Sequence, residues 1–294
     1  MKALKNILVI VDKPKHEQGA LRRALRLQAQ TGANLHLKSF IYHAHVASGN
    51  AFTTKQRSNI RRGLMEQQHD WLMTQGNSAS DTGEITREVV WSSDIAAWTD
   101  NYLSKHPQDL VVKGVNKTES IIHTPLDWEL LRTCPAPLLL CAGLPQKTKP
   151  RILAAIDMNR NKGRQKKLNK KVLSAAAQFA KINSAELHCV YTIEISQVLK
   201  DLGIIQPRIH AREVKKQVLP ELEAILEPFG VPANRIHMPV GKVGKTVSKI
   251  ASKINAQLLV LGTSGRSGVG ALVLGNSAEK VLQKSHCEIL AIKL

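Results

Sequence analysis

The stretch RILAAID at residues 151–157 is a short apolar run that ends in aspartate, and NILVIVD at residues 6–12 has the same form. A continuous apolar run of this length is typical of a strand that is buried on both faces. Further pairs of strand-like runs follow in the same order, namely residues 32–37 and 184–189, 108–114 and 256–262, and 136–141 and 287–292. The shared order predicts a duplicated, domain-sized unit.

Helical patterns alternate with these strands. Residues 17–32 and 169–183 place apolar side chains at three- and four-residue spacing, as amphipathic helices do. The other expected elements are second helices at 56–75 and 212–229, third strands at 84–91 and 234–240, and third helices at 93–106 and 244–255. Alternating strands and helices indicate a parallel sheet with right-handed crossovers. We therefore expect an α/β fold of two tandem five-stranded parallel-sheet domains with flanking helices, over residues 1–144 and 150–294.

The composition is that of a soluble globular protein. Apolar residues make up 43% of the chain and charged residues 22%, and no apolar run reaches the roughly 18 residues that cross a bilayer. The first apolar run is too short for a signal peptide, so we expect a cytoplasmic protein. The formal net charge of +19 predicts attraction to phosphate-rich partners, which include nucleotides, nucleic acids and anionic membrane surfaces.

The four cysteines are Cys134, Cys141, Cys189 and Cys287. Their spacing forms no C-x-x-C motif and no zinc pattern with histidines, so we expect buried, reduced thiols and no metal site. The sequence also shows no nucleophile–base pairing and no carboxylate cluster. We therefore expect no catalytic residues.

A glycine-rich stretch, LGTSGRSGVGALVLGNSAEKVL at residues 261–282, follows the fourth strand of the second half. Asn276 and Ser277 are candidate N-cap residues for a helix that begins there. Ligands of open parallel sheets bind beyond the carboxyl ends of the strands, and a helix N-terminus attracts phosphate. The loop and the helix start therefore predict an anion-binding cradle, with Arg266 as an additional positive charge.

A second stretch, PVGKVGKT at residues 239–246, almost matches the phosphate loop G-x-x-x-x-G-K-[ST]. Pro239 replaces the first glycine, and no matching strand ends in a metal-binding aspartate. We interpret this stretch as a turn and the start of the third helix, with solvated lysines.

With these motifs, the chain resembles the universal stress protein family in its tandem two-domain form, the E type. The nucleotide signature of the family is G-x2-G-x9-G followed by Ser or Thr, and residues 262, 265 and 275 carry its glycines. Asn276 stands at the usual Ser/Thr place, and the hydroxyl follows at Ser277. The resemblance covers nearly the whole chain. It implies a Rossmann-like fold of the adenine-nucleotide-binding type, with ATP as the ligand and Mg²⁺ as an accompanying ion.

The resemblance also implies which residues hold the nucleotide. Asp157 matches an aspartate that faces the base and ribose, and Ala155 and Ile156 match backbone that touches adenine. Val190 matches the adenine contact at the end of the second strand. The complete expected set is Ala155, Ile156, Asp157, Val190, Gly262, Thr263, Gly265, Arg266, Gly275, Asn276 and Ser277.

The first half keeps Asp12 but lacks the signature. Thr124 stands at the position of Gly275, and Pro125 follows it. Proline removes an N–H donor from a helix start, and a β-branched residue does not replace a glycine at positive φ. We therefore expect adenine nucleotide in the second half alone. We also expect the halves to pair as an intramolecular pseudo-dimer, with a homodimer as a further candidate.

Two other functions stay open. A nucleic-acid (RNA) binder would use the basic run of Arg160, Lys162, Arg164, Lys166, Lys167, Lys170 and Lys171. That run holds no aromatic residue for base stacking, and a solvated loop at the rim of the nucleotide site explains it as well. The apolar-rich connection at residues 191–210 would line a cavity for a different small ligand, or pack a short helix on the core. The family resemblance implies at most slow ATP hydrolysis, so we expect a binding protein and not an enzyme.

Overall fold

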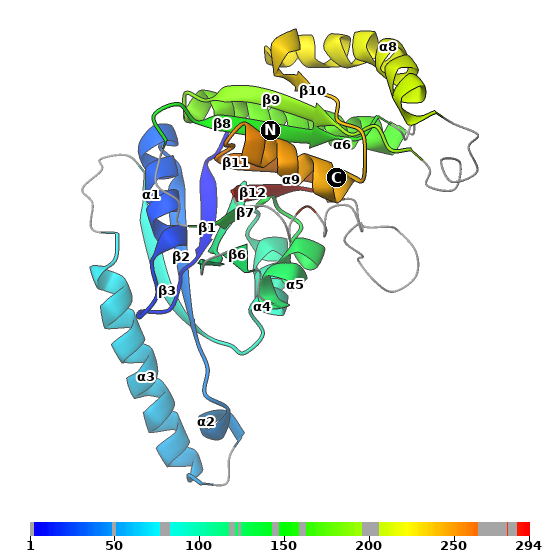
Figure 1. Cartoon of the computed structure of the whole chain (residues 1–294). Helices are drawn as coiled ribbons and strands as arrows, with labels where there is room; N and C mark the ends of the chain where they lie inside the picture. Colours follow the sequence, from blue (N-terminus) through cyan, green and yellow to red (C-terminus); the bar gives the residue numbers. More distant parts are fainter. Residues whose placement is uncertain are drawn as a thin grey trace. The chain divides into compact units, whose positions relative to one another are not determined.

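The computed structural model describes residues 3–48, 51–76, 83–117, 121–122, 125–142, 147–158, 163–195, 206–263, 281 and 287–294. These residues form two compact units, whose elements are labelled in Figure 1. The N-terminal unit is built from Lys2–Lys117 and Thr124–Gly143, and the C-terminal unit contains Leu144–Leu294.

Parallel strands form the sheet of the N-terminal unit in the order β7-β4-β1-β2-β3. Its strands are β1 (Asn6–Ile10), β2 (Asn34–Ile41), β3 (Ile85–Trp91), β4 (Leu110–Gly114) and β7 (Leu138–Cys141). Its helices are α1 (Gly19–Thr31), α2 (Ala44–Ser48), α3 (Thr54–Thr74), α4 (Ile95–Lys105) and α5 (Pro125–Thr133). The two-residue strands β5 (Asn116–Lys117) and β6 (Ile121–Ile122) lie outside this sheet.

The C-terminal unit repeats this arrangement, with parallel strands in the order β10-β9-β8-β11-β12. Its strands are β8 (Arg151–Ile156), β9 (Glu186–Tyr191), β10 (Ile236–His237), β11 (Leu258–Gly262) and β12 (Glu288–Ile292). Its helical segments are α6 (Gly163–Ile182), α8 (Pro207–Leu226), α9 (Val243–Lys253) and the 3₁₀ turns η1 (Glu227–Phe229) and η2 (Ala233–Arg235). The common strand order confirms the predicted tandem α/β fold.

Local sequence explains where the helices begin and end. α1 ends where Gly32 adopts a left-handed backbone with a φ of 69°, a conformation that glycine adopts without steric cost. α3 begins with a capping box, in which the Thr53 hydroxyl accepts from the Gln56 N–H and the Gln56 side chain accepts from the Thr53 N–H.

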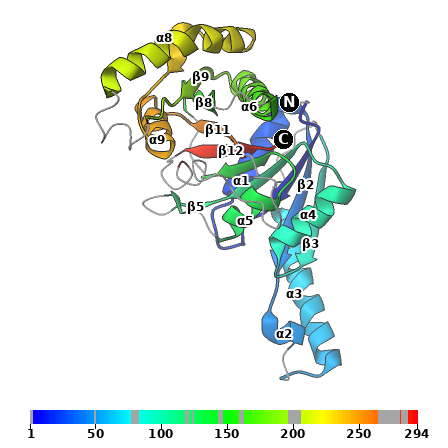
Figure 2. The same cartoon turned by 90° about the vertical axis from the view of Figure 1, so that its right-hand side faces the viewer.

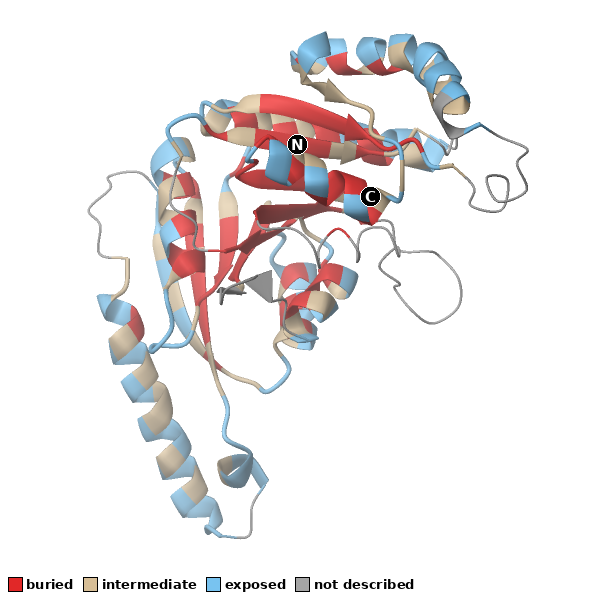
Figure 3. Cartoon of the chain, in the orientation of Figure 1, coloured by how far each residue is buried: buried red, intermediate tan, exposed pale blue. Residues whose placement is uncertain are grey.

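The cores lie along the strands and the inner faces of the helices, as the buried stretches in Figure 3 show. α6 illustrates the pattern, because Leu168, Val172, Ala176 and Phe179 recur at helical spacing and are all buried. Phe179 is fully buried, and truncation of such a side chain to Ala typically costs about 3–5 kcal/mol. One apolar face of this helix therefore stabilises the sheet of the C-terminal unit.

The start of α6 corrects the sequence prediction. The helix begins at Gly163 and not at residue 169, so Arg164, Lys166 and Lys167 lie on an exposed helical surface and not in a loop. Lys170 and Lys171 lie on the same surface, within the expected helix. Apolar periodicity starts only at Leu168, although Arg, Gln and Lys are good helix formers. The remaining members of the basic run, Arg160 and Lys162, lie outside the described residues.

The third strand of the C-terminal unit is also shorter than residues 234–240. β10 contains only Ile236–His237, and a single bridge between Ile193 and Val240 follows it. The chain before β10 forms a 3₁₀ turn that begins after Pro232. Pro239 lacks the N–H that a ladder requires, so pairing stops early.

All four cysteines are buried with free thiols, as the sequence predicts. Burial raises the pKa of the Cys189 thiol and raises the pKa of Cys287 to about 12. Neither group is therefore a reactive thiolate near neutral pH. Within the described ranges, each helix is too short or too polar to cross a bilayer.

Candidate functional site

The carboxyl ends of three neighbouring strands meet in the C-terminal unit. In the register of the sheet, Ala155 of β8 pairs with Val190 of β9 and with Leu261 of β11. The sheet thus brings together every expected site residue that the structure describes, namely Ala155, Ile156, Asp157, Val190, Gly262 and Thr263. The other expected residues, Gly265, Arg266, Gly275, Asn276 and Ser277, lie outside the described residues.

Asp157 follows β8 and is fixed through its backbone. Asn169 of α6 donates from Nδ2 to the Asp157 carbonyl oxygen (2.8 Å) and accepts at Oδ1 from the Asp157 N–H (3.3 Å). Gln165 donates to the same Oδ1 atom (3.0 Å). Because Asn169 is itself buried, these bonds set the place from which the Asp157 side chain projects. Burial and the negative charges of Asp157 and Glu194 raise the pKa of Tyr191.

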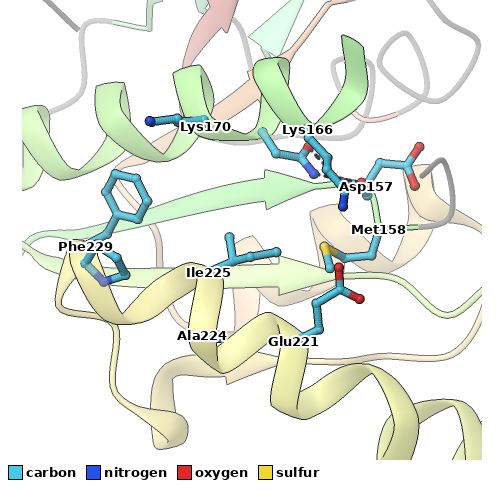
Figure 4. Close-up of a pocket in the computed structure, with 10 residues that line it drawn as sticks. Asp157, Met158, Lys166, Lys170, Glu221, Ala224, Ile225 and Phe229 are labelled. Carbon is cyan, nitrogen blue, oxygen red and sulfur yellow. Dashed lines mark hydrogen bonds between the residues drawn. The ribbon is translucent and has the colours of Figure 1, made fainter. Parts of the chain in front are cut away.

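A cavity of about 430 Å³ lies beside Asp157, between α6 and the segment formed by α8 and η1 (Figure 4). Asp157, Lys166 and Glu221 form its polar end, and Ile225 and Phe229 lie at its apolar end. The Asp157 carboxylate points away from the Phe229 end in this view (Figure 4). The volume falls in the range of pockets that hold small organic ligands.

Sequence reasoning found only part of this cavity. The lysines at 166 and 170 belong to the basic run, but Met158, Glu221, Ile225 and Phe229 carried no signal. Helical periodicity shows which residues face inward and does not show where two helices leave a gap. None of the described residues between 191 and 210 lines this cavity, and residues 196–205 of that connection lie outside the described residues.

Gly262 at the end of β11 is tightly packed. A Cβ on this residue would lie 2.7 Å from Leu168 Cδ2 and 2.8 Å from Leu168 Cγ, which is closer than real side chains approach. The next residue, Thr263, donates its N–H to the Ile292 carbonyl oxygen (2.8 Å) and is 2% exposed. The chain that leads into the glycine-rich stretch is therefore anchored to both α6 and β12.

The corresponding junction of the N-terminal unit, between β4 and α5, holds charges of its own. Lys113 Nζ lies 2.6 Å from Asp127 Oδ1 and also donates to the Gly114 carbonyl oxygen (2.8 Å). Asp127 stands in the first turn of α5 and is completely buried. A carboxylate there interacts favourably with the positive end of the helix dipole, as a bound phosphate would.

The side chain of Asp12 also points into the N-terminal unit. A Cβ on Gly114 would lie 2.8 Å from Asp12 Cγ, so the glycine makes room for the carboxyl group. Asp12 Oδ2 accepts from the Ala20 N–H (3.4 Å) at the start of α1. Burial raises the pKa of Asp12, and the Ala20 N–H and the charge of Lys113 oppose that shift. Asp12 is therefore engaged inside its unit.

The stretch that resembles a phosphate loop leads into α9 and contains its first residues, as expected. Lys242 is the N-cap residue, and it and Lys245 are exposed. The Val243 N–H donates to Glu194 Oε1 (3.3 Å), so a carboxylate of the protein serves this helix start. Within the described part of the chain, no group of three or more His, Cys, Asp or Glu side chains is placed to hold a metal ion.

Comparison with known proteins assigns the fold and the repeat to one family. The model of the "Universal stress protein family" matches residues 3–142 and again residues 150–293. The chain belongs to the universal stress protein family. Two consecutive matches make it a tandem member of that family.

Relatives of similar length support this assignment. Universal stress protein E of Escherichia coli (strain K12) is 28% identical over 300 residues, which cover 100% of this chain and 95% of the relative. The Universal stress protein E homolog of Haemophilus influenzae is 29% identical over 300 residues, which cover 98% of this chain and 97% of the relative. A solved structure described as a putative universal stress protein from Pseudomonas aeruginosa UCBPP-PA14 has a TM-score of 0.72 at 22% identity, over 99% of this chain and 94% of that one.

Proposed function

We propose that this chain is a stress-response protein that binds one adenine nucleotide, ATP, in its C-terminal unit and acts by binding rather than by catalysis. The contrast between the two strand–helix junctions carries the proposal. In the N-terminal unit, Lys113 and Asp127 neutralise each other at the helix start. In the C-terminal unit, Gly262 ends β11, which pairs with the strand that leads into Asp157, and the signature glycines at 265 and 275 come later in the sequence.

The strand ends would hold the nucleoside. Backbone groups of Ala155 and Ile156 and the side chain of Val190 would border the adenine ring. The Asp157 carboxylate accepts hydrogen bonds, so it suits the ribose hydroxyls. Asn169 supports this role because it fixes the backbone of Asp157.

The glycine-rich stretch would hold the phosphates. Backbone N–H groups around Gly265 and Gly275, the polar side chains of Asn276 and Ser277, and the positive charge of Arg266 suit phosphate oxygens. Thr263, whose backbone is tied to β12, would fix the start of the loop. Mg²⁺ binds proteins through one or two carboxylates together with substrate phosphates, and Asp157 offers the carboxylate at this place.

Calorimetric titration with ATP and Mg²⁺ tests the proposal. We expect one site per chain, and Asp157→Ala should weaken binding by about tenfold through the loss of a charge-assisted hydrogen bond. Asp12→Ala is the matched control, because it removes the equivalent aspartate from the N-terminal unit, and it should leave the affinity unchanged. Two equal sites, or equal losses in both variants, would contradict the proposal. Native mass spectrometry of the purified protein would identify a ligand carried from the cell.

A further inference from the structure

We propose that the N-terminal unit carries a surface for single-stranded nucleic acid, formed by the first half of α3 and the aromatic residues beside it. This basic–aromatic surface consists of Tyr42, His43, Phe52, Lys55, Arg57, Arg61, Arg62 and Trp91. It lies on a different unit from the nucleotide site and does not depend on the function proposed above.

Aromatic rings from separate parts of the chain meet at this surface. Trp91 ends β3 and Tyr42 follows β2, and their ring centroids lie 5.7 Å apart. The His43 ring lies 6.5 Å from that of Trp91, and the Arg61 guanidinium carbon lies 5.2 Å from the Trp91 ring centroid. Aromatic rings and arginine planes are the groups on which unpaired bases stack.

Tyr42, His43 and Phe52 are exposed, and Trp91 is half-buried. Tyr42 is 39% exposed and Phe52 is 37% exposed, and both belong to the few large hydrophobic side chains of the described residues that reach solvent to this extent. Arg61 is also exposed. A base can therefore reach this surface without a rearrangement of the core.

Positive charge is concentrated in the same place. Residues 41–65 contain no Asp or Glu, but they contain Lys55, Arg57, Arg61 and Arg62. Arg62 donates to the neutral side chain of Asn59 (3.1 Å). Among the described residues, no carboxylate lies within ion-pair distance of Lys55, Arg61 or Arg62. The charges of Lys55, Arg61 and Arg62 are therefore available to phosphates, whose neutralisation supplies much of the affinity for nucleic acid.

The helix that carries these charges contributes little to the core. α3 has 21 residues, and only Leu72 is buried. Its second half contacts the sheet, where Gln68 Nε2 donates to Ser39 Oγ (2.7 Å). Its first turns and α2 extend past the ends of β2 and β3, as Figure 1 and Figure 2 both show. A long, polar and mostly exposed helix is explained by a role at the surface.

The combination of groups selects the partner. Phosphates require positive charge, and unpaired bases require flat, accessible π-faces, and this surface presents both. The basic residues of α6 had suggested nucleic acid from charge alone. The structure instead places the charges of α3 next to a cluster of rings at the ends of β2 and β3. These residues are distant in sequence, so the sequence alone does not predict that they meet.

Fluorescence anisotropy with a labelled 20-nucleotide oligo(U), an oligo(dT) of equal length and a duplex tests this inference at 50 and 200 mM salt. We expect both single strands to bind more tightly than the duplex and to weaken by at least tenfold at the higher salt. Arg61→Ala combined with Arg62→Ala should weaken binding by about tenfold or more, and Tyr42→Ala by about fivefold or more. Arg61→Lys keeps the charge but loses the planar guanidinium over the Trp91 ring, so it should cost a smaller part of the affinity.

The matched control is Lys215→Ala combined with Lys216→Ala. These residues are an adjacent, exposed basic pair on α8, the corresponding helix of the C-terminal unit, and their loss should change the affinity by less than about twofold. Circular dichroism of each variant verifies folding. Equal losses in the two double variants would show attraction by net charge alone and overturn the proposal. Absence of single-strand binding at 50 mM salt, preference for the duplex, or affinity only for anionic vesicles would overturn it as well.

Discussion

Lys113 Nζ lies 2.6 Å from Asp127 Oδ1, and the two side chains form a buried ion pair at the end of β4. Removal of one partner leaves an uncompensated buried charge. We expect Asp127→Asn or Lys113→Met to lower the free energy of unfolding by about 3–5 kcal/mol, measured by denaturant titration. The double variant Lys113→Met, Asp127→Leu should recover much of this loss. Glu17→Gln, which breaks the exposed pair with Arg22, should cost about 1 kcal/mol or less.

The same pair should prevent a second nucleotide site. Thr124→Gly restores a glycine at the position that Gly275 holds in the C-terminal unit, but Asp127 still occupies the helix start. We therefore expect no additional ATP site in Thr124→Gly by calorimetry. Gly275→Val should abolish ATP binding, because the proposed site requires phosphate to approach this position without a branched side chain. A second site in Thr124→Gly would show that the Lys113–Asp127 pair does not block nucleotide binding. Normal binding by Gly275→Val would exclude the glycine signature as the determinant.

Asn169 should affect nucleotide binding without touching the nucleotide. Its side chain holds both backbone polar groups of Asp157, so Asn169→Ala should release this residue and weaken ATP binding by about tenfold. Asn183→Ala is the matched control, since Asn183 Nδ2 donates to the Phe179 carbonyl oxygen (2.7 Å) near the other end of α6. Equal ATP affinities in the two variants would show that Asn169 has no specific role in nucleotide binding.

Acid should destabilise the C-terminal unit through a histidine pair. His188 Nδ1 lies 3.1 Å from His237 Nε2. Burial, His237 and Arg235 lower the pKa of His188, and burial and Lys253 lower the pKa of His237. The unfolded chain therefore binds more protons than the folded protein as the pH falls below about 6.5, and stability decreases in that direction. His237→Gln should reduce the pH dependence of the melting temperature between pH 7 and 5. The same pH dependence in the variant and in the unmodified protein would contradict the role of this pair.

The strands were predictable because they are continuous apolar runs in a repeated order. Residues 258–262 and 288–292 are almost entirely buried, and such runs report burial directly. The beginning of α6 was not predictable from periodicity, because Gly163 to Lys167 contribute no residue to its buried face. The length of β10 was overestimated because the apolar pattern does not show that Pro232 and Pro239 interrupt strand pairing.

Only those site residues that lie next to a predicted strand in the sequence could be predicted. Asp157 directly follows a recognisable strand, so its place at the carboxyl ends of the parallel strands could be inferred from the topology. The ion pair between Lys113 and Asp127 could not be predicted from the sequence, because charged residues are normally assigned to the surface. The contact between Arg61 and Trp91, which joins α3 to β3, could not be predicted either. Contacts between distant segments depend on tertiary packing that periodicity does not describe.

The close approach of Gly262 to Leu168 has a consequence for genetic screens. A substitution at Gly262 would be recovered among loss-of-binding alleles and assigned to ligand contact. Its steric effect would instead reach Leu168, the immediate neighbour of Asn169, and through that residue the backbone of Asp157. Intragenic suppressors of Gly262→Ala should therefore arise at codon 168 as smaller residues, and they would distinguish an allele that displaces a helix from one that removes a ligand contact.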